Sequence, residues 1–305
     1  MARNGGAPRR LSLEVRENVN FPAGLSNLPA MDFLAHWQLR ERPFEATWDP
    51  RFFYASPEHE EALSRLQYLV EETTMNVGLL SGEIGCGKTL TRAVFAARLD
   101  SRRIQVVTLE NSGFPFNDLL AAILRRLEPS GPANGSKFER CERLETALKR
   151  LTAQGRHLLL LLDEAQDMPA AGLHQLRWLT NFNGGGQAAV TLVLIGQPEL
   201  RPLVAADAAL NQRISLRFHL RPLRREDVPG YVRHRLRAAG HATGELFDEA
   251  AADAVFTCTR GVPREVNRLA KLALEQAWVA EAARVAAASV AAVVRDLERH
   301  QALPV

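Results

Sequence analysis

The chain has 305 residues, of which 46% are hydrophobic and 24% charged, and its formal net charge is +3. These fractions are typical of a folded globular protein and exclude a disordered polymer. No apolar run approaches the roughly 18 residues that a membrane helix needs, and the N-terminus lacks the apolar stretch of a secretory signal. Three widely spaced cysteines, Cys86, Cys141 and Cys258, fit neither a disulfide framework nor a zinc site, so we expect a cytoplasmic protein.

Residues 1–30 mix glycine, proline, asparagine and arginine without periodicity, and we interpret them as a flexible basic arm. Such an arm could contact phosphate backbones, although a solvated tail is the simpler interpretation. Residues 31–55 carry scattered aromatic side chains among prolines, which predicts an ordered but irregular segment that packs against something. Ser56-Pro57 then begins a helix, with serine at the N-cap and proline at the first position.

From residue 75 onward, short apolar runs alternate with amphipathic stretches. The predicted strands are 75–81, 103–110, 156–163, 189–196 and 214–220. Between them, one predicted helix follows the glycine-rich turn and runs to about residue 99, and the others are 115–127, 137–153 and 172–182. Continuous apolar strands that alternate with helices indicate a parallel sheet covered on both faces.

Beyond residue 222 the pattern is helical only, with predicted helices at 226–239, 248–258, 263–280 and 288–299. The predicted fold class is therefore α/β with an all-helical end. We expect a core domain at 31–222 and a helical domain at 223–305.

The segment 82–89, Gly-Glu-Ile-Gly-Cys-Gly-Lys-Thr, fits the pattern G-x-x-x-x-G-K-[ST] between a predicted strand and a predicted helix. Glycines let backbone N–H groups point at phosphates, the helix adds its positive N-terminus, and the lysine and threonine serve phosphate and Mg²⁺. A coincidental turn is the alternative. The residues expected to bind ATP are Gly82, Glu83, Ile84, Gly85, Cys86, Gly87, Lys88, Thr89 and Leu90.

A second element follows the leucine-rich strand at 158–162, where Asp163 and Glu164 come together. A carboxylate at such a strand end can hold Mg²⁺, and a second one can deprotonate the attacking water. We therefore expect Thr89 and Asp163 at the metal and Glu164 as the catalytic base. The alternative is an acidic strand end that caps the next helix.

Mechanism suggests three further positions. Gln197, after the fourth strand, could sense the γ-phosphate. An arginine must neutralise charge during phosphoryl transfer and can come from a neighbouring subunit, for which Arg213 is the first candidate and Arg217 the second. Arg264, which opens a helix of the C-terminal part, could reach back to the phosphates. A surface salt bridge is the alternative for each arginine.

Two features admit two interpretations each. Cys86 beside a helix N-terminus could be a reactive thiol with a lowered pKa, or a small loop residue without a role. The arginines within 221–237 could contact DNA or a partner, or form a solvated helix face.

Taken together, these motifs resemble the AAA+ superfamily, and within it the ExeA/GspA-like ATPases and their transposition relatives of the TnsC, TniB and MuB group. The segments that carry the resemblance are Trp48-Asp49-Pro50-Arg51-Phe52-Phe53-Tyr54, the loop 82–89, Leu160-Leu161-Leu162-Asp163-Glu164-Ala165-Gln166, Gly196-Gln197-Pro198-Glu199-Leu200, Gln212-Arg213-Ile214 and Gly261-Val262-Pro263-Arg264. They span about residues 32–300.

The resemblance implies a Walker A loop at 82–89, a Walker B strand at 159–164, sensor 1 at Gln197, an arginine finger at Arg213 and sensor 2 at Arg264. It also implies the sheet order 5-1-4-3-2, a helical lid, an aromatic segment 44–54 beside the adenine, and a ring or filament of identical subunits with ATP between them. Secretion-type members continue into a membrane span that this sequence does not show, which favours a soluble member.

The expected function is hydrolysis of Mg-ATP in a homo-oligomer that remodels or times assembly of a protein or protein–DNA complex. The client protein is not identified by the sequence. One alternative is an ATP-dependent regulator of transposition that binds duplex DNA. Another is a slowly hydrolysing nucleotide switch or adaptor for envelope or secretion machinery.

Overall fold

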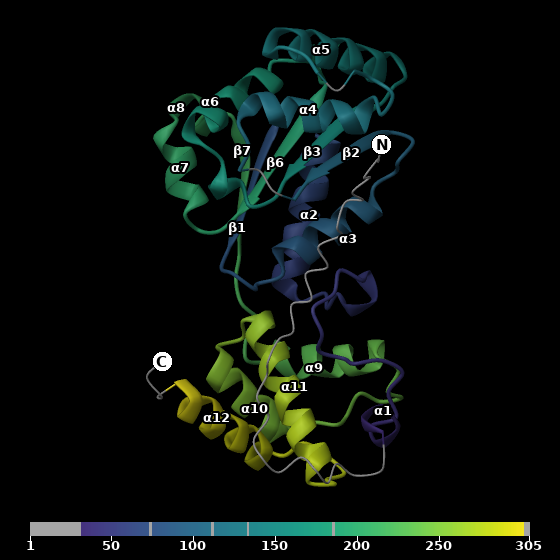
Figure 1. The fold of residues 1–305 in the computed structure, drawn as a ribbon, viewed down its shortest axis with the longest axis vertical. Helices are drawn as coiled ribbons and strands as arrows, with labels where there is room; N and C mark the ends of the chain where they lie inside the picture. The colour runs from purple at the N-terminus through teal and green to yellow at the C-terminus, as the bar shows by residue number, and fades with distance from the viewer. Residues whose placement is uncertain (1–31, 73–74, 111–112, 133, 185–186, 302–305) are drawn as a thin grey trace, which may run out of the picture.

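The computed structural model describes residues 32–72, 75–110, 113–132, 134–184 and 187–301, so the predicted arm 1–30 lies outside the described residues. Figure 1 shows an α/β part above and a bundle of C-terminal helices below, with residues 32–56 running alongside that bundle. The carboxyl edge of the sheet lies between the two parts.

The α/β part is built on five parallel strands. They are β1 (Val77–Gly82), β2 (Ile104–Leu109), β3 (His157–Leu162), β6 (Val190–Gly196) and β7 (Ile214–Leu220). Their order is β2-β3-β6-β1-β7, and every pairing is parallel. Numbered along the chain, this is 2-3-4-1-5, so the predicted order 5-1-4-3-2 is confirmed, as is the α/β class.

Helices cover both faces of the sheet, as the apolar strands require. Residues of β3 alternate between two cores, because successive side chains of a strand point to opposite faces: Leu158 and Leu160 enter one core, Leu159 the other. The first face is covered by α4 (Phe116–Leu127), α5 (Lys137–Ala153) and α6 (Ala170–Leu179). The second is covered by α2 (Pro57–Glu71) and α3 (Lys88–Arg98).

Two short helices and a small antiparallel pair were not predicted. The helices are α7 (Leu200–Ala206) and α8 (Ala208–Asn211), and the pair is β4 (Asn183–Gly184) with β5 (Gln187–Ala188). None of these elements is long enough to show a periodic pattern, and a proline, Pro202, lies within the first of the two helices. The antiparallel pair lies just before β6 in the chain, and the two helices lie between β6 and β7.

The helical part comprises α9 (Asp227–Ala238), α10 (Glu249–Thr259), α11 (Pro263–Val279) and α12 (Ala287–Gln301). Its core also contains aromatic side chains from the segment before the sheet, including Phe33 of α1 (Phe33–His36), Phe44 and Phe52. Phe44 and Phe52 are buried there, while Phe53 packs in the core of the second sheet face, so the expected place of the aromatic segment 44–54 beside the adenine stays a prediction. The domain boundaries stay predictions.

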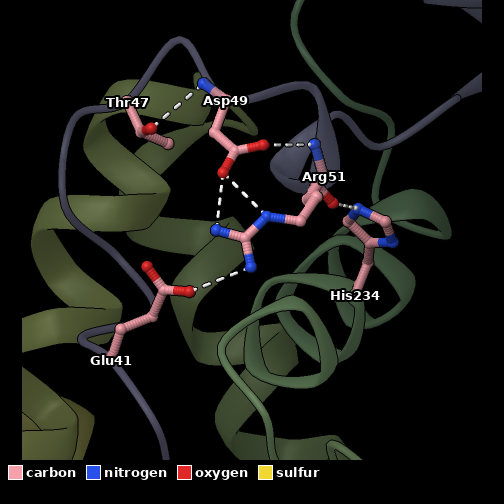
Figure 2. A network of polar contacts seen from close by, with 5 residues as sticks. All are labelled: Glu41, Thr47, Asp49, Arg51 and His234. Atoms are coloured by element: carbon pink, nitrogen blue, oxygen red, sulfur yellow. Dashed lines mark hydrogen bonds and ion pairs between the residues drawn. The ribbon is translucent and has the colours of Figure 1, made fainter.

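Polar contacts fasten the same segment to α9. Figure 2 shows Asp49, whose carboxylate accepts hydrogen bonds from the backbone nitrogen and the side chain of Arg51, at 2.9 and 2.8 Å. Arg51 also pairs with Glu41 at 3.1 Å, and the ring of His234 donates to the carbonyl of Arg51 at 3.0 Å. The turn at 49–52 is thereby held in one conformation against the helix.

Arg235 of α9 is buried where the segment before residue 57 packs against this helix. Its guanidinium donates to the carbonyls of Pro43 and Glu45, both at 2.7 Å, and lies over the ring of Phe52. The sequence offered a solvated helix face or a contact to DNA or a partner for this arginine. Its buried hydrogen bonds give Arg235 a structural role instead.

We expect Arg235→Met to lower the free energy of unfolding by about 2–5 kcal/mol, because each buried carbonyl left without a donor costs about 1–3 kcal/mol. Urea denaturation followed by circular dichroism measures the change. Arg233→Met, an exposed position of the same helix, is the matched control and should change stability little. Equal losses in both variants would contradict the structural role of Arg235.

Candidate functional site

The glycine-rich loop joins β1 to α3 at the carboxyl edge of the sheet. Gly85 and Gly87 have φ angles of +84° and +95°, which L side chains rarely adopt. A Cβ on Gly87 would lie 2.9 Å from His59 Nε2, and one on Gly85 would lie 2.6 Å from the Cβ of Arg264. Both conformation and space therefore require glycine at these two positions.

Lys88 is the cation of the loop. Its side chain is buried, and Nζ donates to the carbonyls of Gly82 and Glu83 at 2.7 and 3.0 Å. Burial lowers the pKa of Lys88, while Glu164, Cys86, Asp163 and Glu83 oppose that shift. The ammonium is thus held against the loop backbone, where it can meet an anion.

Thr89 and Asp163 meet across the site, with the threonine hydroxyl donating to Asp163 Oδ2 at 3.2 Å. Asp163 is 2% exposed, and burial raises the pKa of its carboxyl. Arg92, also buried, approaches the same oxygen with Nε at 3.5 Å and reaches Glu110 at 3.3 Å. A hydroxyl and a carboxylate this close are oxygen ligands of the kind that Mg²⁺ prefers.

Glu164 and Gln197 lie at the ends of neighbouring strands on this same edge. Glu164 follows β3 and adopts the left-handed conformation with φ +50°. Gln197 follows β6, and its backbone N–H is bound by the side chain of Gln166 at 3.0 Å. The predicted base and the predicted sensor are therefore brought together at the edge that carries the loop.

Arg264 reaches the loop from the helical part. Its backbone N–H donates to the carbonyl of Gly85 at 3.2 Å, while its side chain is exposed. The first turn of α11 therefore contacts the loop itself, while the reach of the Arg264 side chain to the phosphates stays a prediction.

Arg213 lies elsewhere. It precedes β7 and donates to the carbonyl of Arg177, to Thr180 Oγ1 and to Asn181 Oδ1. The seven residues of β7, at about 3.3 Å each, place it roughly 20 Å from the carboxyl edge, where Leu220 pairs with Gly82. The second candidate, Arg217, is exposed and bonded to Asn211. Arg213 cannot reach the loop of its own chain.

His59 is a residue of the site that sequence reasoning missed. Its Nε2 donates to the carbonyl of Cys86 at 3.1 Å, and its Nδ1 accepts from Ser56 Oγ at 2.7 Å. Burial lowers the pKa of His59, which keeps the neutral ring that this pair of bonds needs. A single histidine in a predicted helix gave no signal of this contact.

Cys86 is completely buried, and burial raises the pKa of its thiol to about 11. The interpretation as a reactive thiol with a lowered pKa is therefore wrong. The thiol packs in the core beneath the loop, among residues such as Phe95 and Leu220.

We expect Cys86 to resist iodoacetamide at pH 8, where roughly one thiol in a thousand is ionised for a pKa of about 11. Its alkylation should rise with pH as the thiolate fraction grows. Peptide mass spectrometry would follow the reaction, with exposed Cys258 as internal reference and urea-unfolded protein as control. Labelling of Cys86 as fast as Cys258 in the folded protein would contradict the assignment.

Among the other arginines of 221–237, Arg224 pairs with Glu58 at 3.2 Å and Arg225 pairs with Asp253.

Within the described parts of the chain, no group of three or more histidine, cysteine, aspartate or glutamate side chains is arranged to hold a metal ion. No helix of those parts is long and apolar enough to cross a membrane.

The chain is similar in sequence to known proteins. Residues 71–204 match the family model described as an AAA domain. General secretion pathway protein A of Aeromonas hydrophila is 34% identical over 243 residues, which is 79% of this chain and 44% of that protein. The chain thus spans less than half the length of this relative.

Solved structures share the fold at low sequence identity. The ORC2 protein of Aeropyrum pernix matches with a TM-score of 0.63 and 17% identity, over 87% of this chain and 75% of that one. The ORC1 protein of Aeropyrum pernix, solved in complex with DNA, matches with a TM-score of 0.55 and 20% identity, over 79% and 65%.

The strand order and the glycine-rich loop after the first strand, together with the matched domain, define the class: the chain is a member of the AAA+ ATPase family. Its likeness to General secretion pathway protein A extends beyond the matched domain. Within the family, the chain belongs to the ExeA/GspA-like group.

Proposed function

We propose that the chain binds Mg-ATP at residues 82–89 and hydrolyses it between the subunits of a homo-oligomer, and that this turnover remodels or times assembly of a protein or protein–DNA complex. The observation that carries the proposal is the convergence of Lys88, Thr89, Asp163 and Glu164 at one edge of the sheet. A buried cation, an oxygen pair for a metal and a second carboxylate to accept a proton are what phosphoanhydride hydrolysis requires.

Each group has a role in this proposal. Backbone N–H groups of 82–90 and the side chain of Lys88 bind the phosphates, and Arg264 approaches them from α11. Thr89 and Asp163 would hold Mg²⁺, which supplies positive charge to the phosphate oxygens when bound. Glu164 accepts the proton of the attacking water, and Gln197 senses the γ-phosphate.

The place of Arg213 supports the proposed oligomer. Because Arg213 lies roughly 20 Å from the loop of its own chain, it could act on ATP only from a neighbouring subunit. Phosphoryl transfer gains most from an arginine that neutralises charge in the transition state, and such a residue can be supplied in trans. A ring or a filament of identical subunits satisfies this geometry equally.

The biological partner is a separate part of the proposal. General secretion pathway protein A is named for secretion, and one structural neighbour was solved with DNA. We propose a cytoplasmic protein that acts on a protein client, and the mild net charge of +3 gives no strong reason to add duplex DNA.

The test is steady-state phosphate release by the purified protein with and without duplex DNA, together with its mass in ATP by light scattering. Turnover with ATP-dependent assembly supports the proposal. Stimulation by DNA that weakens steeply with salt would favour a protein–DNA complex. A protein that binds ATP, stays monomeric and releases no phosphate would contradict the proposal.

A further inference from the structure

Gln166 uses both ends of its amide to connect two parts of the site. It lies in the short helix η3 (Ala165–Asp167) that follows Glu164. Its Nε2 donates to Glu164 Oε2 at 2.8 Å, and its Oε1 accepts the backbone N–H of Gln197 at 3.0 Å. One side chain therefore joins the carboxylate at the end of β3 to the backbone at the end of β6.

The strand end beside this bridge is a glycine. A Cβ on Gly196, the last residue of β6, would lie 2.4 Å from Gln166 Oε1. Glycine at this position lets the amide approach the strand end. On the other side, the φ of +50° turns Glu164 out of the strand direction, while its N–H donates to Asp163 Oδ1 at 3.1 Å. Such a backbone persists only where neighbouring contacts fix it.

We propose that Gln166 is a positioning residue that fixes the carboxylate of Glu164 and couples its orientation to the end of β6. The inference rests on the proposed hydrolysis. A donor on Oε2 restrains the carboxylate and leaves its other oxygen to accept a proton, which is the geometry that a general base needs. Because the same amide holds the N–H of Gln197, a shift of that strand end moves the base.

Gln166→Glu separates the two bonds. The new carboxylate keeps the length of the side chain and still accepts from Gln197, but it cannot donate to Glu164 and repels it instead. We expect kcat to fall about tenfold to a hundredfold, the range that a misplaced catalytic group produces. The dissociation constant for Mg-ATP should change less than about threefold, since no phosphate ligand is altered.

The matched control is Gln67→Glu. Gln67 is exposed on α2, and its Nε2 donates to Glu71 Oε1 at 2.8 Å, so the same change breaks the same kind of contact away from the site. This variant should keep the parental kcat. A fall in ATP affinity as large as the fall in kcat for Gln166→Glu would overturn the positioning role.

A double-mutant cycle with Glu164→Gln tests the contact apart from turnover. With glutamine at 164, an amide can donate to the new carboxylate at 166, so Gln166→Glu should lower the urea midpoint in the parent and lower it clearly less in the Glu164→Gln background. Equal shifts in both backgrounds would overturn the inference. Absence of parental turnover would refute the proposed hydrolysis, and the cycle alone would then decide the contact between residues 164 and 166.

Discussion

Glu164→Gln is expected to lower the rate of ATP hydrolysis by about 10²- to 10⁴-fold, the contribution of a positioned general base. The amide has the size of the carboxylate but accepts no proton at neutral pH. It lies beside Asp163, Thr89 and Lys88, whose positions it does not alter, so the affinity for Mg-ATP should stay within a few-fold. Phosphate release and binding of a fluorescent ATP analogue measure the two quantities.

The same variant should keep its oligomer assembled for as long as ATP remains bound, because the nucleotide is not consumed. Lys88→Ala is the contrasting control: it removes the buried ammonium and, when it is the sole protein present, should abolish ATP binding and assembly together. Hydrolysis by Glu164→Gln at the parental rate would mean that another group takes the proton.

Arg213→Ala is the second variant with a large expected effect. An arginine supplied to a neighbouring site is worth about 10³- to 10⁵-fold in kcat. Because Arg213 lies far from the loop of its own chain, its loss should leave ATP affinity unchanged. The arginine also donates to Arg177 and Asn181, so a melting curve must show that the variant is folded.

Mixing tests whether the arginine acts between subunits. Arg213→Ala subunits bind ATP but lack the arginine, whereas Lys88→Ala subunits lack the nucleotide but carry the arginine. A mixed oligomer should recover part of the lost turnover. Arg217→Ala serves as the matched control, because this exposed arginine of β7 is bonded to Asn211. Loss of turnover in the control with none in Arg213→Ala would exchange the two assignments.

Periodicity was sufficient to predict the long elements. β3 is five leucines after a histidine, an apolar run typical of a strand buried on both faces. α5 was predicted at its observed bounds, and in the structure Ser136 and Glu139 form a capping box at its start. The short helices α7 and α8 have too few residues for a period. The sequence also could not show that Phe44 and Phe52 pack against helices some 200 residues away.

Some residues of the candidate site could be predicted from the sequence and others could not. Short sequence patterns whose residue types the chemistry requires predict Lys88, Thr89, Asp163 and Glu164. His59, Gln166 and Arg92 act through contacts that only the fold creates: a carbonyl of the loop, the backbone after β6 and the buried carboxylate of Asp163. Residues that support a site are recognised by what they touch, and sequence spacing does not report that.

The central claim is that this chain hydrolyses the ATP it binds at residues 82–89. A single-turnover experiment with protein in excess over γ-labelled ATP and Mg²⁺ tests it most directly, because every ATP is then bound. We predict that labelled phosphate appears in one exponential phase in the parent and that Lys88→Ala, which should not bind ATP, releases none. ATP recovered intact from the bound state, over hours and at concentrations where light scattering shows an oligomer, would contradict the claim.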